Sequence, residues 1–166
     1  KWFFISDRQR NIIKNRPFYE RLKPSYLWKN VIFSINHMEI LIMTAIIGAI
    51  AFSMVIVLSI LIICGLPLGE LTMGGQYKVF PKNLRILLVS QLILQIFFVL
   101  VILQMGDFIP LWFSVKVTKI IGIVMASYLS LNTIMNAVSK SKKERYIMTP
   151  LSLISSICFW ITALNM

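Results

Sequence analysis

Long runs of apolar residues dominate the chain and determine the elements that its sequence predicts. Four runs reach the roughly 20 residues that a helix needs to cross the hydrocarbon core of a membrane. None of them alternates between polar and apolar positions over about ten residues, as the strands of a membrane β-barrel do. The pattern therefore predicts an all-α polytopic membrane protein, a four-helix transmembrane bundle with spans at about residues 40–64, 86–105, 111–138 and 148–166.

Residues 1–37 follow a different pattern, in which basic and aromatic residues are interleaved. Lys and Arg side chains at a membrane surface meet lipid phosphates, and aromatic rings lie among the headgroups. We therefore expect an amphipathic N-terminal interfacial segment, with Tyr26–Ile35 as a helix leading into the first span. A flexible basic tail is the alternative. Residues 38–166 then form the transmembrane domain.

The stretch between the first two spans is rich in glycine and proline. Gly65 and Pro67 predict the end of the first helix. A Gly-Gly pair between β-compatible residues predicts a small β-hairpin, which would cap one end of the bundle. Because loops carry function more often than cores do, Glu70, Gly74 and Gly75 are candidates for a ligand or partner site. Alternatively, the hairpin only covers exposed helix ends.

Composition narrows the class of protein further. The chain has 166 residues, of which 58% are hydrophobic and 14% charged, and its mean hydropathy is +0.81. A typical soluble domain carries roughly 25% charged residues, so this composition argues against a soluble enzyme. The net charge of +11 comes from basic residues beside the apolar runs. These residues predict contact with anionic lipid headgroups and no binding of nucleic acid.

The charges leave the orientation in the membrane open. An even number of spans places both termini on one side. The basic N-terminal segment favours a cytoplasmic location for that side, because positive charge is retained in the cytoplasm. The first and third loops, which are also basic, favour the reverse.

Two lysines inside the third span form the first candidate binding site. Lys116 and Lys119 stand three residues apart, so they share one helix face. A charge inside a span is a functional-site hypothesis by default, here for an anion or a lipid headgroup, with Asp107 as a partner. The alternative is that both side chains extend to water from the first turns of the helix.

Four carboxamides within the spans form the second candidate site. Gln91 and Gln95 are four residues apart in the second span, and Asn132 and Asn136 repeat this spacing in the third. Such residues either hydrogen-bond between helices, at roughly 0.6 kcal/mol per contact, or line a polar pathway. Hydroxyl groups of the fourth span could serve as their partners: Ser152, Ser155, Ser156 and Thr162.

Small residues recur at helical spacing in two spans. Ala45, Ala49 and Ser53 lie four apart in the first span, and Gly122 and Ala126 in the third. Such stripes let helix backbones approach closely. They predict a compact bundle, a homo-oligomer or association with a larger membrane complex.

The sequence offers little for catalysis. His37 is the only histidine, and Cys64 and Cys158 form no metal-ligand spacing, so we expect no metal and no cofactor. HExxH, GxSxG and P-loop motifs are missing. Carboxylates suited to acid–base work come from separate elements, at Glu39, Glu70 and Asp107. The sequence leaves open whether the protein is an enzyme, and the scarcity of acid–base residues favours a protein without enzymatic activity.

Two stretches carry a resemblance to a known group of proteins, GELTMGGQYKVFP at Gly69–Pro81 and LNTIMNAVSKSKKERYIMTPLS at Leu131–Ser152. They resemble uncharacterised small four-helix membrane proteins of low-GC Gram-positive bacteria, over about residues 40–166. The resemblance implies that the four spans form one unit in a bacterial cell membrane. That family has no assigned activity, so the resemblance implies no functional residues.

Two function classes follow. The first is a non-enzymatic membrane protein, either a transport component or an accessory subunit. The second is a membrane-embedded enzyme or binding protein acting on a lipid-like or anionic substrate. A closed bundle without a polar cavity would favour an accessory role. A lateral cleft lined by the lysines and glutamines would favour the second class.

Overall fold

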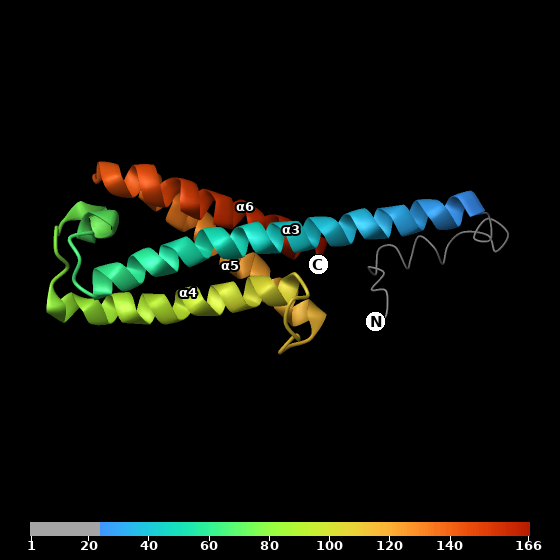
Figure 1. The fold of residues 1–166 in the computed structure, drawn as a ribbon, viewed down its shortest axis with the longest axis horizontal. Coiled ribbons are helices and arrows are strands. Elements are labelled where there is room, and N and C mark those ends of the chain that lie inside the picture. Colours follow the sequence, from blue (N-terminus) through green and yellow to red (C-terminus); the bar gives the residue numbers. More distant parts are fainter. Residues whose placement is uncertain (1–23) are drawn as a thin grey trace.

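The computed structural model describes residues 24–166, without the side chains of residues 24–31, 33 and 34. Over these residues the protein is all-helical, with no strand, which confirms the all-α part of the predicted fold class. Figure 1 shows four long helices that run alternately back and forth. They are α3 (Pro24–Ile63), α4 (Arg85–Met105), α5 (Val115–Ala137) and α6 (Thr149–Asn165).

All four helices are long and apolar enough to cross a membrane. The candidate spans suggest an integral membrane location, and they cover Ile35–Ile63, Lys82–Met105, Val115–Ala137 and Glu144–Asn165. α5 begins at Val115, a few residues after the start of its apolar run at about residue 111. The physical reason is the N-cap residue Ser114, whose hydroxyl accepts a hydrogen bond from the backbone N–H of Val117.

The core lies where the four helices meet. α6 packs against α3 and α5, and α3 also packs against α4. Of the helices that follow one another in the chain, α4 and α5 pack together least closely. The main apolar cluster takes residues from every helix: Ala45, Ala49, Phe52, Phe98, Val101, Ile102, Met105, Met125, Ala126, Leu129, Cys158, Phe159 and Ala163.

The stripes of small residues are used for packing within the chain, except for Ser53, which is exposed. Ala45 and Ala126 are completely buried in the main cluster. A Cβ atom on Gly122 would clash with Met105 of α4 and lie 3.1 Å from the Cβ of Ala163 in α6. The stripes therefore account for close helix packing in a compact bundle, while homo-oligomer formation stays a hypothesis.

α3 extends well beyond the other helices at its N-terminal end, as Figure 1 shows. Its 40 residues correspond to about 60 Å, roughly twice the thickness of a hydrocarbon core. The helix predicted at Tyr26–Ile35 is confirmed as part of α3. Its interfacial position is a hypothesis, and the preceding part of the N-terminal segment, residues 1–23, lies outside the described residues.

The predicted end of the first helix is also confirmed. α3 ends at Ile63, and Gly65 adopts a positive φ of 96°. The backbone N–H of Leu66 donates to the carbonyl oxygen of Leu61, and that of Gly65 donates to the oxygen of Ile62. This is the Schellman arrangement that closes a helix with glycine in the left-handed conformation.

The predicted hairpin at Gly74 and Gly75 is wrong. The segment instead forms short 3₁₀ turns, η1 (Gly69–Leu71) and η2 (Met73–Gly75), followed by η3 (Lys82–Leu84) before α4. The flanking apolar residues do not pair as strands, because Leu71 and Phe80 are buried against the helix ends. They form a second apolar cluster with Ile62, Leu88 and Met148. The loop caps the bundle through side-chain burial rather than through a strand ladder.

Candidate functional site

A cleft of about 900 Å³ separates α4 from α5. It lies in the half of the bundle nearest the loops 64–84 and 138–143, which we call the loop end. α3 contributes its floor, and residues around η2 cover its end. The sparse contacts between α4 and α5 explain why the space stays unfilled. We call this space the polar cleft.

The polar cleft brings together all four carboxamides that the sequence singles out. Gln91 and Gln95 line it from α4, and Asn132 and Asn136 line it from α5. The four-residue spacing places each pair on one helix face, and antiparallel packing makes the two faces meet. Gly74 also lines the cleft, so one of the three loop candidates belongs to the same site.

The four carboxamides differ in their hydrogen bonding. Asn136 donates from Nδ2 to the hydroxyl of Ser152 in α6, at 3.4 Å. Among the described residues, Gln91, Gln95 and Asn132 have no hydrogen-bond partner for their side chains. Gln95 is only 5% exposed, and its Oε1 is buried without a donor. Leaving such a group unsatisfied costs roughly 1–3 kcal/mol, which a hydrogen bond from water or from a ligand in the cleft would offset.

Apolar side chains form much of the remaining lining. They include Phe52, Val55, Leu87, Leu94, Phe98 and Leu129. The rings of Phe98 and Tyr128 meet edge to face, with centroids 5.6 Å apart, and they bridge α4 and α5 at the inner end of the cleft. The cleft thus offers amide groups and an apolar surface side by side, which suits an amphipathic ligand.

The buried carboxylate of Glu144 connects the loop 64–84, which covers the end of the cleft, to the loop 138–143. Glu144 is 7% exposed and lies in the π-helical turn η4 (Glu144–Met148) that leads into α6. Its Oε2 accepts hydrogen bonds from the backbone N–H of Gly74 at 2.9 Å and from the hydroxyl of Ser139 at 2.5 Å. All three residues line the cleft. Single π-helical turns are frequent at functional sites.

Ser141 strengthens the same connection. Its hydroxyl donates to the carbonyl oxygen of Glu70 at 2.6 Å. A Cβ atom on Gly75 would lie 2.6 Å from the Cβ of Ser141, and Gly75 has a φ of 73°. A side chain at position 75 would therefore be both strained and too close to Ser141. We call the set Glu70, Gly74, Gly75, Ser139, Ser141 and Glu144 the loop junction.

An ion pair completes the loop junction at its outer side. Lys143 Nζ lies 2.8 Å from Oε2 of Glu70. The hydrogen bond and the charge of Lys143 lower the pKa of the Glu70 carboxyl below its ordinary value of 4.5, and Lys78 adds a smaller effect. Glu70 and Gly75 thus hold two loops together, and neither lines the cleft.

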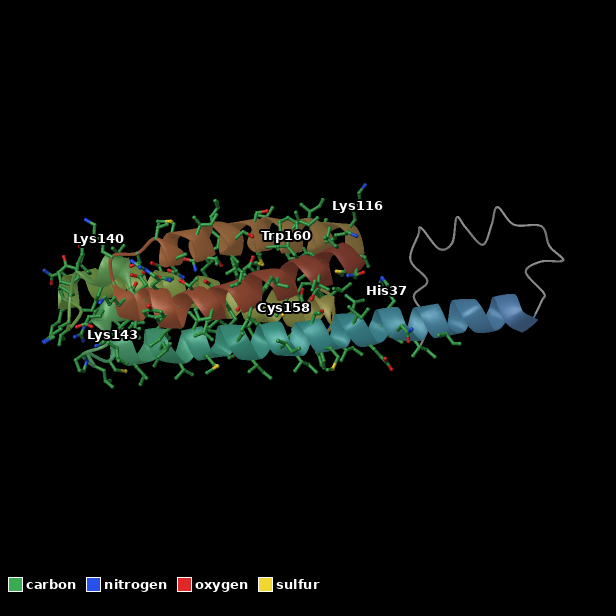
Figure 2. All side chains as sticks on the ribbon, turned by 90° about the horizontal axis from the view of Figure 1, so that it is seen from above. His37, Lys116, Lys140, Lys143, Cys158 and Trp160 are labelled. Carbon is green, nitrogen blue, oxygen red and sulfur yellow. The ribbon has the colours of Figure 1, made fainter. Side chains whose placement is uncertain are left out.

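Lys116 and Lys119 lie at the opposite end of the bundle. Figure 2 shows Lys140 and Lys143 at the loop end and Lys116 at the other end. Lys119 donates to the carbonyl oxygens of Leu164 and Met166, at 3.3 and 3.2 Å, and so satisfies free carbonyls at the end of α6. Lys116 is exposed. The structure does not bring the two lysines together with the carboxamides.

Sequence reasoning missed Glu144 and Ser139 as parts of the site. Glu144 is the one acidic residue among Lys140, Lys142, Lys143 and Arg145, and a lone carboxylate in such a run was the available signal. Its role depends on Gly74, which lies 70 residues earlier in the chain. Within the described residues, no group of three or more His, Cys, Asp or Glu side chains could hold a metal ion.

No protein-family model, curated protein or solved structure matches the chain. A helical architecture of this kind serves many different activities, so the fold alone does not define a function. The residues of the polar cleft therefore carry the functional inference.

Proposed function

We propose that this chain is a non-enzymatic integral membrane protein, a transport component whose polar cleft binds an amphipathic, lipid-like molecule. The observation that carries the proposal is the placement of unpartnered carboxamides beside an apolar lining in one cleft. The amide groups receive the polar head of the molecule, and the apolar residues receive part of its chain. Polar groups inside spans are costly to maintain and mark functional sites.

The depth of the carboxamides supports this proposal. Gln95 lies ten residues after Arg85, the first residue of α4, which corresponds to about 15 Å along the helix axis. If α4 spans a hydrocarbon core of about 30 Å, Gln95 lies near its middle. At that depth lipid chains offer no hydrogen bonds, so an unpartnered amide is satisfied only by a ligand or by water.

The chemistry of the lining favours binding over catalysis. Among the described residues, Glu144 is the one carboxylate that lines the cleft, and its Oε2 already accepts two hydrogen bonds. General acid–base catalysis needs a group that is free to take or give a proton at the substrate. We therefore assign Glu144 to holding the loop junction in place.

We further propose that the four helices form one transmembrane bundle in a bacterial cell membrane. The resemblance of Gly69–Pro81 and Leu131–Ser152 to small four-helix membrane proteins supports this location. The basic residues at the loop end then contact anionic lipid headgroups. They are Lys78, Lys82, Arg85, Lys140, Lys142, Lys143 and Arg145.

An accessory subunit is the second candidate, and the length of α3 favours it. The helix continues beyond the bundle, and Ile32, Ile35 and Met38 are exposed on this extension. Exposed apolar residues on a helix that continues beyond the bundle offer a surface for another membrane protein. Both functions are compatible in one chain, because the extension lies at the end opposite the polar cleft.

Photo-crosslinking tests whether a lipid enters the cleft. The protein is reconstituted in vesicles that contain phosphatidylethanolamine with a diazirine in one acyl chain, and adducts are mapped by mass spectrometry. We expect an adduct on Val55, which is partly exposed and lines the cleft. Ile93, which is 65% exposed and outside the cleft lining, reports ordinary lipid contact.

Two matched variants sharpen this experiment. Gln91→Trp fills the cleft from its rim and should abolish the adduct on Val55. Ile93→Trp adds the same side chain to an exposed position of α4 outside the cleft lining, and it should leave the adduct unchanged. An adduct pattern confined to outward-facing residues in the wild-type protein would contradict lipid entry.

A further inference from the structure

We infer that the head group taken by the polar cleft is uncharged and rich in hydroxyl groups, as in a glycosylated diacylglycerol. This inference rests on the proposed function and names the class of its ligand. It follows from the kinds of polar group that line the cleft, from their unused hydrogen-bonding capacity and from the scarcity of charge among them.

Carboxamides match hydroxyl groups in their hydrogen bonding. Each side-chain amide both donates and accepts, and so does each hydroxyl of a polyol or sugar. Gln91, Gln95 and Asn132 face the cleft with this capacity unused, from two different helices. Ser59 and Ser90 add hydroxyls to the lining. A head group with several hydroxyls can satisfy these groups from both sides of the cleft.

The charges near the cleft do not favour an anionic head group inside it. Among the described residues, Lys140 and Glu144 are the charged residues that line the cleft, so its lining has a net formal charge of zero, and Lys140 is exposed. Glu144 faces backbone and hydroxyl donors within the loop junction. Lys140 is exposed at the loop end, whereas Gln95 is buried, so a phosphate beside Gln95 would be buried away from this cation, which is costly.

Three other basic residues of the loop end make contacts within the chain. Arg145 donates to the carbonyl oxygen of Ser139, Arg85 donates to that of Phe80, and Lys143 pairs with Glu70. None of these three cations lines the cleft. They suit contact with lipid phosphates at the membrane surface, while the cleft itself stays nearly neutral.

The size of the cleft suits such a head group. Binding sites for drug-sized molecules occupy about 300–1,000 Å³. A cleft of about 900 Å³ has room for a sugar-sized head group together with part of an acyl chain.

Native mass spectrometry of the purified full chain, released from a sugar-free detergent, tests the inference. Three lipids with identical dioleoyl chains serve as probes: a monoglucosyl diacylglycerol, a phosphatidylglycerol and a diacylglycerol. We expect the glucosyl lipid to bind about tenfold more tightly than the other two, equivalent to about 1.4 kcal/mol. Equal or tighter binding of phosphatidylglycerol would overturn the inference.

Variants locate the preference in the cleft. The double variant Gln95→Leu with Asn132→Leu should lose the tenfold preference. Gln104→Leu is the matched control, because Gln104 is a buried glutamine of α4 that does not line the cleft. It should keep the preference. Asn132→Lys places a cation in the cleft and should shift the preference toward phosphatidylglycerol.

The outcomes separate this inference from the proposed function. If the double variant binds every lipid as the wild type does, the cleft is not a lipid site and both proposals fail. If the double variant loses binding but the wild type prefers phosphatidylglycerol, the cleft binds lipid and only the head-group inference fails. Elution and helical content of each variant, compared with Gln104→Leu, show that it is folded.

Discussion

Oε2 of Glu144 accepts a hydrogen bond of 2.9 Å from the backbone N–H of Gly74, which lies 70 residues earlier in the chain. The contact joins the loop that covers the polar cleft to the turn that begins the last helix. Both partners line the cleft, so this bond determines how the cleft is closed at the loop end.

Removing the Glu144 carboxylate should therefore loosen the cover of the cleft. Glu144→Leu leaves the N–H of Gly74 and the hydroxyl of Ser139 without their acceptor, at a cost of roughly 1–3 kcal/mol. Glu144→Gln keeps one acceptor oxygen, so it should destabilise the loop less than Glu144→Leu does. Hydrogen exchange measures the effect, which we expect as faster exchange at Thr72–Gln76. Glu39→Gln, at an exposed acidic residue of α3, is the control; unchanged exchange in Glu144→Leu would contradict the role of this bond.

Gln95 and Asn136 should respond differently to the same substitution. Gln95 has a buried, unpartnered Oε1, so Gln95→Leu should leave the stability of the ligand-free protein unchanged or raise it by up to about 1 kcal/mol. Asn136→Leu removes the hydrogen bond to Ser152 and should cost roughly 0.6 kcal/mol. Thermal unfolding in detergent measures both. A larger loss for Gln95→Leu than for Asn136→Leu would show that Gln95 stabilises the bundle itself.

The spans and the shared faces of the carboxamides were predictable from the sequence. Apolar runs of sufficient length identify helices because a helix satisfies its own backbone hydrogen bonds in lipid. The four-residue spacing of Gln91 with Gln95, and of Asn132 with Asn136, places each pair on one face. Which helices face each other depends on packing, so the sequence did not show that Asn136 reaches Ser152 while Asn132 has no partner among the described residues.

The loop at Gly74 shows why the loop conformation and its contacts were not predictable from the sequence. Its local signal, two glycines between β-compatible residues, is that of a hairpin. Burial of Leu71 and Phe80 against Ile62 and Met148 outweighs that signal. The partner of the loop, Glu144, belongs to a distant segment, and only the folded chain brings the two together.

Lys119 should matter for the end of α6 and not for the polar cleft. Its ammonium group donates to the carbonyl oxygens of Leu164 and Met166, so Lys119→Met should increase hydrogen exchange in the last turn of α6. Lipid binding should be unaffected, because the cleft lies at the other end of the bundle. Lys116→Met, at an exposed lysine one turn away, is the control and should change neither property. Loss of lipid binding in Lys119→Met alone would move the binding site to the end with the lysines.

The ion pair between Glu70 and Lys143 should make the loop junction sensitive to acid. Lys143 lowers the pKa of the Glu70 carboxyl in the folded protein, so the unfolded chain takes up this proton first as the pH falls. The stabilising contribution is therefore complete above a pH of about 4.5 and is lost as the pH falls through the lowered pKa. The melting temperature of the wild type, compared with that of Lys143→Met, isolates this contribution from other titrating groups.

At neutral pH we expect the wild type to melt at a slightly higher temperature than Lys143→Met. The difference should be small because Lys143 is largely exposed, and it should shrink toward zero in acid. Lys142→Met, which removes a neighbouring exposed charge, is the matched control, and a difference between wild type and Lys143→Met that stays constant down to the lowest pH would rule out the ion pair as its source.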